Sequence, residues 1–213
     1  MSLEIALQSK SFGDTQVLGN VDLSFPDGQI AVLLGPSGCG KSTLLSLIAG
    51  LDDEYVGKFT APDGPIAMVF QGPRLLPWRT LAQNIGLIPG SGGIGRARQL
   101  LARVGLHESA DQFPQKVSLG MQRRASLARA LAIKPSLILM DEPLVSLDAE
   151  TAADMRGLIA GTLAEAGATT LIATHDRREA LHLADRIIAL GGTPTGVVSD
   201  VENPIPRGDR HDP

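Results

Sequence analysis

A glycine-rich run, GPSGCGKST at 35–43, contains the residues best suited to hold a phosphate group. Gly35, Gly40, Lys41 and Ser42 fit the spacing G-x-x-x-x-G-K-[ST] without a mismatch. The backbone N–H groups of such a turn surround a phosphate chain, the lysine reaches its terminal phosphates, and the serine hydroxyl can hold a magnesium ion. A helix that begins at Lys41 adds the positive end of its dipole. The run predicts a nucleoside-triphosphate site formed by Gly35, Pro36, Ser37, Gly38, Cys39, Gly40, Lys41, Ser42 and Thr43.

Two adjacent carboxylates and a histidine follow two other apolar runs. Asp141 and Glu142 come directly after Leu137–Met140, and His175 comes shortly after Thr169–Ala173. Adjacent carboxylates repel each other unless a counter-charge is near, and magnesium with a nucleotide would supply one. We therefore expect Asp141 to hold the ion and Glu142 to polarise an attacking water. A histidine at a strand end is often only a hydrogen-bonding partner, but here a contact with the γ-phosphate is the favoured interpretation.

Three more side chains are candidates for the same site, and two of them have an ordinary alternative. Gln71 follows the apolar run Ile66–Phe70 and could contact the metal or a water bound to it, although capping a turn is the commoner use of such a residue. Phe12 could stack on a purine base or be an ordinary core phenylalanine, and residue type does not decide between the two. Val17, which follows Phe12, is assigned to the nucleotide together with it.

The candidate residues need a sheet whose strand ends meet at one edge. Ile30–Leu34 and Leu137–Met140 are short apolar runs without interruption, typical of strands that are buried on both faces of a parallel sheet, and Thr169–Ala173 is predicted as a further buried strand. Alternation of apolar and polar residues predicts antiparallel strands at Leu3–Lys10 and Val21–Phe25, which lead into the first of these runs. The pattern indicates an α/β fold with a mainly parallel sheet and an N-terminal antiparallel part.

Helical patterns occupy much of the sequence between these strands. They predict helices over Arg96–Val104 and Thr151–Ala166, and a third helix that Ser118 opens as its N-cap. Gly120, two residues after Ser118, leaves backbone amides free to meet an anion. In this third helix, Arg123 and Arg124 could contact phosphate or a partner, but a solvent-exposed helix face is the favoured interpretation.

Composition limits the classes of function. The 213 residues suit a single domain, and a net charge of −4 predicts no binding to nucleic acid. Cys39 is the single cysteine, so no internal disulfide is expected, and within the loop it is interpreted as a small loop residue and not a nucleophile. Trp78, the single tryptophan, either packs among helices or is an exposed anchor for a partner. Without a signal peptide or an apolar run of about 20 residues, we expect a membrane role only through a partner.

In their order along the chain, these motifs resemble those of the nucleotide-binding subunit of ABC transporters. GPSGCGKST at 35–43 resembles its Walker A, Gln71 its Q-loop glutamine, VSLGMQRR at 117–124 its signature motif, LILMDEP at 137–143 its Walker B with the catalytic glutamate, SLDA at 146–149 its D-loop, and His175 in ATHD its switch histidine. Phe12 falls where the family has an adenine-stacking aromatic. The resemblance implies a P-loop NTPase core that forms one ABC ATPase domain over residues 1–213, with a helical subdomain inserted at about 72–134.

The resemblance also implies a mechanism that two copies share. In the family, two subunits close head to tail, and each ATP lies between the Walker A of one and the signature helix of the other. The cofactors would be ATP and Mg²⁺, with Ser42, Gln71 and Asp141 at the metal. Residues acting across the dimer would be Ser118, Gly120, Met121 and Gln122 of the signature, and Asp148 of the D-loop.

Three departures from the family pattern limit this comparison. Leu119 stands where the usual signature LSGG has a glycine, which predicts weaker closure or lower turnover. The stretch from Lys41 to Gln71 is short, which predicts a trimmed antiparallel part. The chain ends soon after His175, so we expect no added regulatory domain.

Only short sequence segments bear on the identity of the transported solute. LLPWRT at 75–80 and PIPRGDR at 204–210 resemble the importers of nitrate, aliphatic sulfonates and taurine, and LAQNIGL at 81–87 resembles those of thiamine. The expected partners are integral membrane permease subunits and, indirectly, an extracytoplasmic solute-binding protein, with the subunit peripheral on the cytoplasmic face of the membrane. The alternatives are a soluble ABC ATPase without a transport role and a degenerate regulatory subunit with weak hydrolysis.

Overall fold

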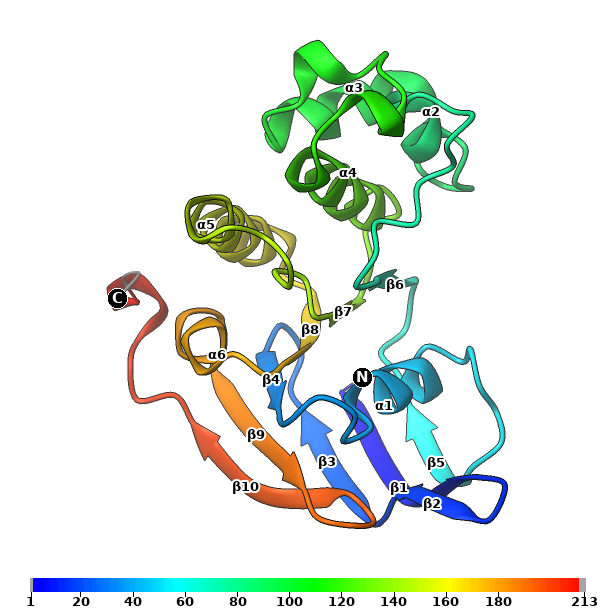
Figure 1. The fold of residues 1–213 in the computed structure, drawn as a ribbon, viewed down its shortest axis with the longest axis vertical. Coiled ribbons are helices and arrows are strands. Elements are labelled where there is room, and N and C mark those ends of the chain that lie inside the picture. The colour runs from blue at the N-terminus through cyan, green and yellow to red at the C-terminus, as the bar shows by residue number, and fades with distance from the viewer. Residues whose placement is uncertain (1, 211–213) are drawn as a thin grey trace.

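Two β-sheets and a set of helices make up residues 2–210, which are the residues that the computed structural model describes (Figure 1). The first sheet contains β1 (Leu3–Phe12), β2 (Thr15–Leu18), β3 (Val21–Phe25) and β5 (Val56–Thr60). The second contains, in spatial order, β10 (Gly196–Glu202), β9 (Arg186–Gly191), β4 (Ile30–Leu34), β8 (Thr169–Thr174), β7 (Leu137–Asp141) and β6 (Ile66–Val69). The helices are α1 (Lys41–Ile48), α2 (Leu81–Gly86), α3 (Gly93–Arg103), α4 (Leu119–Leu131), α5 (Ala149–Ala166) and α6 (Arg177–Leu183), with 3₁₀ turns at His107–Ser109, Pro114–Lys116 and Arg207–Asp209.

The first sheet is antiparallel, as the alternating patterns predict. On β1 the residues Leu3, Ile5 and Leu7 are buried while those between them are exposed, and the buried residues of β3 lie directly opposite. Leu3 pairs with Phe25, and Ile5 pairs with Leu23. This register keeps the four side chains on one face of the sheet, which can therefore cover a core.

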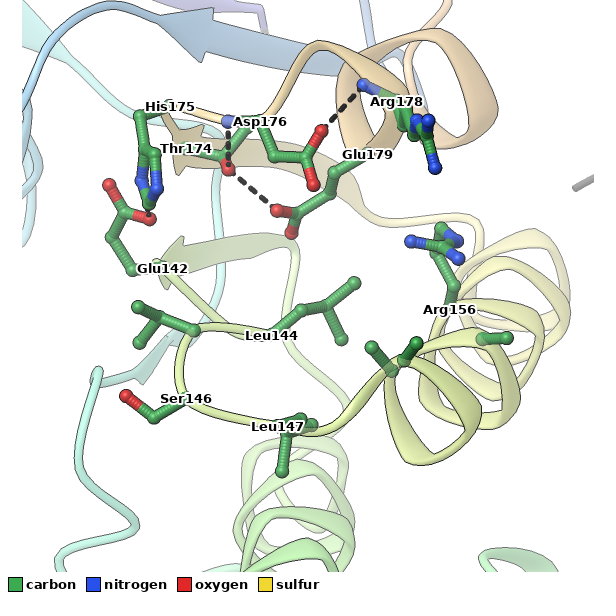
Figure 2. A pocket seen from close by; sticks show the side chains of 14 residues that line it. Glu142, Leu144, Ser146, Leu147, Arg156, Thr174, His175, Asp176, Arg178 and Glu179 are labelled. Atoms are coloured by element: carbon green, nitrogen blue, oxygen red, sulfur yellow. Dashed lines mark hydrogen bonds and ion pairs between the residues drawn. The ribbon is translucent and has the colours of Figure 1, made fainter. Parts of the chain in front are cut away.

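The second sheet is parallel except for β10, and its strand ends carry the candidate residues. β8 lies between β4 and β7, with Leu34 opposite Thr174 and Asp141 opposite Ala173. The carboxyl ends of the three strands therefore meet at one edge of the sheet. Figure 2 shows Glu142 and His175 side by side just past the ends of β7 and β8.

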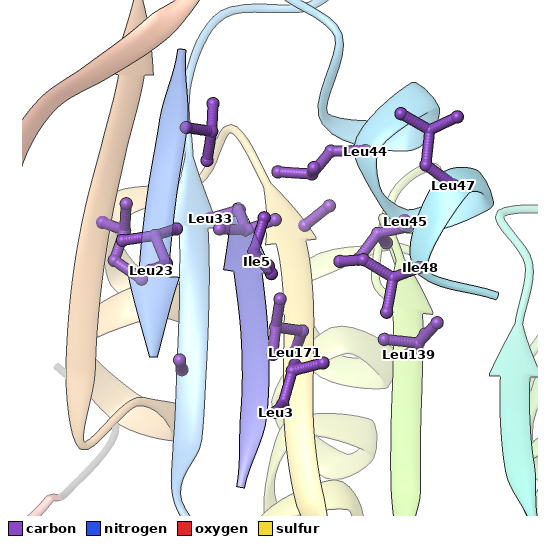
Figure 3. Packing of buried hydrophobic residues seen from close by; sticks show 14 of the residues in the cluster. Leu3, Ile5, Leu23, Leu33, Leu44, Leu45, Leu47, Ile48, Leu139 and Leu171 are labelled. Carbon is purple, nitrogen blue, oxygen red and sulfur yellow. The ribbon is translucent and has the colours of Figure 1, made fainter. Parts of the chain in front are cut away.

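Both faces of the parallel sheet are covered, which explains its uninterrupted apolar runs. On one face, Leu33, Leu139 and Leu171 pack with α1 and with the antiparallel sheet (Figure 3). On the other face, alternate residues of the same strands pack with α5 and α6. Because α1 begins directly after the glycine-rich loop, its buried leucines fix the place of Lys41 and Ser42 relative to the strand ends.

A third apolar cluster lies within α2, α3 and α4, at the end of the molecule opposite the antiparallel sheet (Figure 1). The helix predicted from Arg96 begins three residues earlier, at Gly93. Gly92 has the left-handed backbone (φ 81°) and allows the helix to begin there. Trp78 lies on the loop before α2 with 68% of its surface exposed, so the alternative of packing among helices is wrong.

The α/β fold class is confirmed, although some strands have no clear signal in the sequence. β2 and β10 are edge strands with few buried residues, so their residues show little apolar pattern. Among residues 2–210, no helix has the length and apolar character needed to cross a membrane.

Candidate functional site

Three neighbouring strand ends form the floor of the candidate site. Past the last paired residues, the backbone N–H of Gly35 donates to the carbonyl of Thr174 at 3.2 Å, and that of Glu142 donates to the carbonyl of Ala173 at 2.9 Å. These bonds extend the sheet by one residue on each side of β8. They place the glycine-rich loop and the two catalytic candidates within reach of each other.

The loop after β4 has the backbone that its glycines allow. Gly38 and Gly40 have φ values of 80° and 95°, which residues with a side chain rarely adopt. A side chain at Gly35 would meet the sulfur of Cys39 and the carbonyl of Leu190, each at 2.8 Å. Glycine is therefore required at these three positions to hold the loop tightly above the strand end.

Lys41 is buried beneath this loop. Its Nζ donates to the carbonyls of Gly35 at 2.8 Å and Pro36 at 3.0 Å, and lies 3.6 Å from a carboxylate oxygen of Glu142. Only 4% of its side chain is exposed, so its charge acts on the loop and on Glu142 with little screening by water. The ammonium group therefore lies where the terminal phosphates of a nucleotide in this loop would come.

The carboxylates of Asp141 and Glu142 have different surroundings. Asp141 accepts a hydrogen bond from the hydroxyl of Ser42 at 2.8 Å, and its burial raises the pKa of the carboxyl above the ordinary value, against the effect of that hydrogen bond. Glu142 instead faces the nucleotide loop and contacts Nδ1 of His175 at 2.8 Å. The two carboxylates can thus have two different roles, since Asp141 contacts Ser42 and Glu142 contacts His175.

The contact between Glu142 and His175 fixes the orientation of the imidazole. An ionised carboxylate can only accept, so Nδ1 donates its proton in this bond and Nε2 is left for a ligand. The side chain of His175 is 49% exposed while that of Glu142 is 13% exposed. The histidine thus lies at the surface of the site, over a carboxylate that is largely shielded from water.

An open cavity of about 420 Å³ lies in front of these groups, which is large enough for a bound nucleotide. Its lining residues are Phe12, Val17, Ser37, Gly38, Gly40, Lys41, Ser42, Thr43, Gln71, Glu142, Val145 and His175. Gly35, Pro36, Cys39 and Asp141 lie behind this lining. Phe12 is 53% exposed at the end of β1, so the alternative of a core phenylalanine is wrong. Val145 was missed in the sequence, because an apolar residue in a loop carries no signal of its own.

The donor set at the loop fits a magnesium ion. Ser42 and Asp141 present oxygen atoms that are already 2.8 Å apart, and Gln71 lines the same cavity. Oxygen ligands from a few side chains, completed by phosphates and water, are what Mg²⁺ prefers. Two carboxylates here face a single ammonium group, that of Lys41, and a divalent cation would balance the remaining negative charge.

The residues predicted to act across a dimer lie away from this cavity. Ser118 caps α4, where its hydroxyl accepts from the N–H of Met121 at 3.2 Å, while the Met121 side chain packs into the cluster of α2, α3 and α4. Gln122 donates to the carbonyl of Val117 at 3.3 Å. A side chain at Gly120 would meet Thr151 at 2.9 Å. None of the four lines the cavity among residues 2–210.

Asp148 caps α5 and also lies outside the cavity lining. Its carboxylate accepts from the N–H of Thr151 at 2.9 Å and from the Thr151 hydroxyl at 2.7 Å. The backbone hydrogen bond from Thr151 is the main cause that lowers the pKa of this carboxyl. The D-loop aspartate is therefore held as an anion at a helix N-terminus.

A second cavity of about 550 Å³ lies on the other side of Glu142 and His175 (Figure 2). On its wall, Glu179 of α6 accepts from the hydroxyl of Thr174 at 2.6 Å, and that hydroxyl accepts from the N–H of Asp176 at 3.0 Å. This chain of bonds holds the turn that carries His175. Burial raises the pKa of Glu179 to about 7, and the hydrogen bond from Thr174 partly opposes this. The sequence reasoning assigned neither Thr174 nor Glu179 to the site.

The expectation of a solvent-exposed face for Arg123 is wrong. Arg123 is 6% exposed, and its guanidinium donates to the carbonyls of Pro143 and Val145. Its spacing from Gly120, Leu127 and Ala130, which are buried on the same helix, could have revealed this from the sequence. Arg124 fits the expectation better, since it is partly exposed and lies 3.6 Å from Asp154.

Comparison with known proteins gives consistent results. Residues 18–145 match the family described as ABC transporter. The chain is 41% identical over 214 aligned residues to the aliphatic sulfonates import ATP-binding protein SsuB 1 of Pseudomonas syringae pv. syringae, covering 99% of this chain and 90% of that protein. It is 45% identical over 196 residues to SsuB 2 of Agrobacterium fabrum, covering 89% and 76%. Among solved structures it resembles the ATP-binding cassette MJ0796, a dimer in a post-hydrolysis state bound to ADP and Pi, with a TM-score of 0.79, 29% identity, and coverage of 94% and 98%.

Proposed function

This chain belongs to the ABC transporter family, and from that premise we propose that it is the ATP-hydrolysing subunit of an importer for aliphatic sulfonates. The solute class rests on the printed names of relatives that are about two-fifths identical over nearly all of the chain. Nitrate, taurine and thiamine remain the nearest other solutes on the basis of the short strings at 75–87. Residues 1–213 would act as one ATPase domain, with about 72–134 as its helical subdomain.

The group formed by Lys41, Glu142 and His175 is the observation that carries the assignment of hydrolysis. The carboxylate of Glu142 would accept a proton from the water that attacks the γ-phosphorus, while the bond between phosphorus and the ADP oxygen breaks. The ammonium of Lys41 would balance the charge of the terminal phosphates. His175, fixed by Glu142, would contact the γ-phosphate through Nε2. The products are ADP, phosphate and a proton.

Mg²⁺ would be held by Ser42 and Asp141, with Gln71 at its edge. When bound, the ion supplies positive charge against the phosphate oxygens. The hydrogen bond from Ser42 to Asp141 keeps both oxygens on the same side of the loop. Phe12 and Val17, at the far end of the cavity lining, would contact the base.

The function requires a dimer, in which the signature residues of one subunit complete the site of the other. Ser118 is exposed at the N-terminus of α4, which also carries Gly120, Met121 and Gln122, and this terminus would meet the phosphates bound to the partner. Asp148 would lie between the two sites. Head-to-tail closure is supported by the dimeric structure with ADP and Pi that this chain resembles.

The permease would dock on an apolar groove of about 590 Å³ next to the loop that follows Gln71. Leu51, Leu76 and Leu87 lie in its lining and are exposed, and Trp78 projects from the same loop. Asn84 holds this loop by bonds to the backbone of Leu76, Arg79 and Thr80. A firm loop beside an apolar groove suits a membrane subunit whose motion must follow that of the ATP site.

In this arrangement the chain is peripheral, on the cytoplasmic face of the membrane. An extracytoplasmic solute-binding protein would be an indirect partner, on the far side of the permease. Two other functions are weaker. A soluble ABC ATPase without a transport role is disfavoured by the import function in the names of the relatives. A regulatory subunit with weak hydrolysis is disfavoured because Glu142 lies next to both Lys41 and His175.

The substitution Glu142→Gln tests the proposed chemistry. Glutamine keeps the size of the side chain but cannot accept the proton of water, so we expect turnover to fall by about 10²- to 10⁴-fold. ATP affinity should stay within about threefold, because the loop and Lys41 are untouched. Phosphate release and nucleotide binding measure the two quantities. Glu150→Gln, in the first turn of α5, is the control for loss of one charge. Hydrolysis at the wild-type rate in Glu142→Gln would refute the proposal.

A further inference from the structure

Arg123 connects α4 to the turn that carries Glu142. Its Nη1 lies 3.5 Å from the carbonyl of Glu142 and donates to that of Pro143, and its Nη2 donates to that of Val145. The guanidinium is planar and has five N–H donors in fixed directions, so it can hold several carbonyls at once. The side chain thus holds three backbone carbonyls of this turn, within residues 142–145.

The turn needs such support because of its backbone conformation. Glu142 and Ser146 both have positive φ, at 47° and 62°, although neither is glycine. This left-handed conformation is unfavourable for residues with a side chain and persists only where the surroundings impose it. The direction of the Glu142 side chain follows from its φ, so whatever holds the turn also sets the distance from this carboxylate to Lys41 and His175.

The same helix begins with the signature residues. Ser118 is the N-cap of α4, and Arg123 lies five residues further along. On the proposed function, on which this inference rests, Ser118 meets the nucleotide of the partner subunit. The two ends of one short rigid segment would therefore contact the ATP of the other site and the catalytic turn of its own site.

We infer that Arg123 is a positioning residue that holds Glu142 in its catalytic place, and that it makes hydrolysis in one site depend on closure of α4 over the nucleotide of the other. A shift of α4 on closure moves the guanidinium and with it the three carbonyls. Closure of α4 over the partner's nucleotide thus adjusts the alignment of the Glu142 carboxylate in its own site.

The substitution Arg123→Gln tests this inference in the full-length protein with ATP as the ligand. Glutamine can reach one carbonyl at most, so we expect kcat to fall by about 10- to 100-fold, since a small misplacement of a catalytic group has an effect of this size. ATP affinity should change less than threefold, and the Hill coefficient for ATP should fall toward 1. Arg123→Lys, which keeps the buried charge but not the planar fork, should recover part of kcat and guards against a failure of Arg123→Gln to fold.

Arg98→Gln is the control for loss of one arginine, because Arg98 lies on α3 and its guanidinium donates to Asp111 at 2.7 Å and not to the turn that carries Glu142. It should leave kcat and the Hill coefficient at wild-type values. A folded Arg123→Gln protein with wild-type kcat would overturn the positioning role, and so would a parallel loss of kcat and ATP affinity. A Hill coefficient of 1 in the wild type would overturn the dependence between sites.

A second measurement separates positioning of Glu142 from damage to the signature end of α4. In the Glu142→Gln background, which should retain ATP without hydrolysing it, the double variant with Arg123→Gln should still dimerise with ATP. Loss of that dimer would overturn the inference. Failure of the proposed function itself has a different signature, namely no ATP hydrolysis by the wild type or unchanged hydrolysis by Glu142→Gln alone.

Discussion

At the scale of single residues, Glu142 shows how a proposed catalytic side chain can be held by an unfavourable backbone. A left-handed conformation costs a residue with a side chain about 1–2 kcal/mol, and Glu142 adopts it directly after a fully buried strand. The bonds from Arg123 to the turn and the contact of His175 with the carboxylate offset this cost. As a result, two successive carboxylates have different partners: Asp141 contacts Ser42, whereas Glu142 lies next to Lys41 and His175.

Leu119 is the residue whose substitution we most expect to raise the rate of ATP hydrolysis. It is the first residue of α4, 42% exposed, and its φ is not in the left-handed region, so its backbone does not require a glycine there. Its side chain would come between the helix N-terminus and the phosphates of a partner. We expect Leu119→Gly to raise kcat/KM for ATP by about 3- to 10-fold, because backbone amides could approach the phosphates more closely.

The measurement is phosphate release as a function of ATP concentration, with Leu119→Ala expected to lie between wild type and Leu119→Gly. ATP-dependent dimerisation in the Glu142→Gln background should strengthen in the same order. Equal or lower activity in Leu119→Gly would show that the leucine does not hinder closure.

The sequence predicts the residues that face a nucleotide better than those that hold them in place. Lys41, Ser42 and His175 belong to short motifs with a chemical reason for each position. Arg123 and Glu179 act by contacts with backbone or side chains far along the chain, and such contacts leave no local motif. A charged residue in a helix is also more often exposed than buried, and for Arg123 that general tendency gave the wrong answer.

At the scale of elements, the predicted strands are those whose two faces are determined by the sequence. β4, β7 and β8 are buried along nearly their whole length, and mostly apolar, because helices or a second sheet cover both faces. β10 is an edge strand that pairs with β9. Most of its residues are exposed, so they do not need to be apolar. Helix ends were less well predicted, since α3 begins among glycines that usually mark loops.

Glu179 links α6 to the end of β8, and its charge state makes that link sensitive to pH. The pKa of this carboxyl is raised from 4.5 in the unfolded chain to about 7 in the folded protein, mainly by burial. The folded protein therefore keeps a proton that the unfolded chain has lost between these two values. The stability that comes from this group is complete below about pH 4.5 and is lost as the pH rises to about 7.

Glu179→Gln should remove this loss, since a glutamine does not titrate and its oxygen can still accept from Thr174. We expect the variant to be more stable than the wild type at pH 8, by up to about 3 kcal/mol of unfolding free energy. The difference should disappear near pH 5. Denaturant unfolding at several pH values measures it, with Glu4→Gln on the exposed side of β1 as a control for one lost charge. A wild type that is the more stable protein at pH 8 would contradict the expectation.

At the scale of the whole molecule, the proposed head-to-tail dimer gives each chain two halves of different sites. The cavity beside Lys41 is lined by the loop, strand ends and neighbouring turns, and the N-terminus of α4 is exposed elsewhere on the chain. Two such chains related by a twofold axis would bring each half against the complementary half of the other. A substitution in one half should therefore damage only one of the two sites in a mixed dimer.

This arrangement predicts that two variants, each inactive alone, recover ATP hydrolysis when they are mixed. Lys41→Ala should abolish phosphate binding in its own chain, and Ser118→Arg should block the helix N-terminus that serves the partner. Each alone should hydrolyse ATP at background rates, because every site in its homodimer contains one damaged half. In an equal mixture, about half of the dimers pair one variant with the other, and one of their two sites is intact. Phosphate release should then return to as much as about a quarter of the wild-type rate, less if the sites depend on each other. The double variant Lys41→Ala/Ser118→Arg is the control, since an equal mixture of it with either single variant contains no intact site. Activity of Ser118→Arg alone near the wild-type rate would show that one chain contains a complete site.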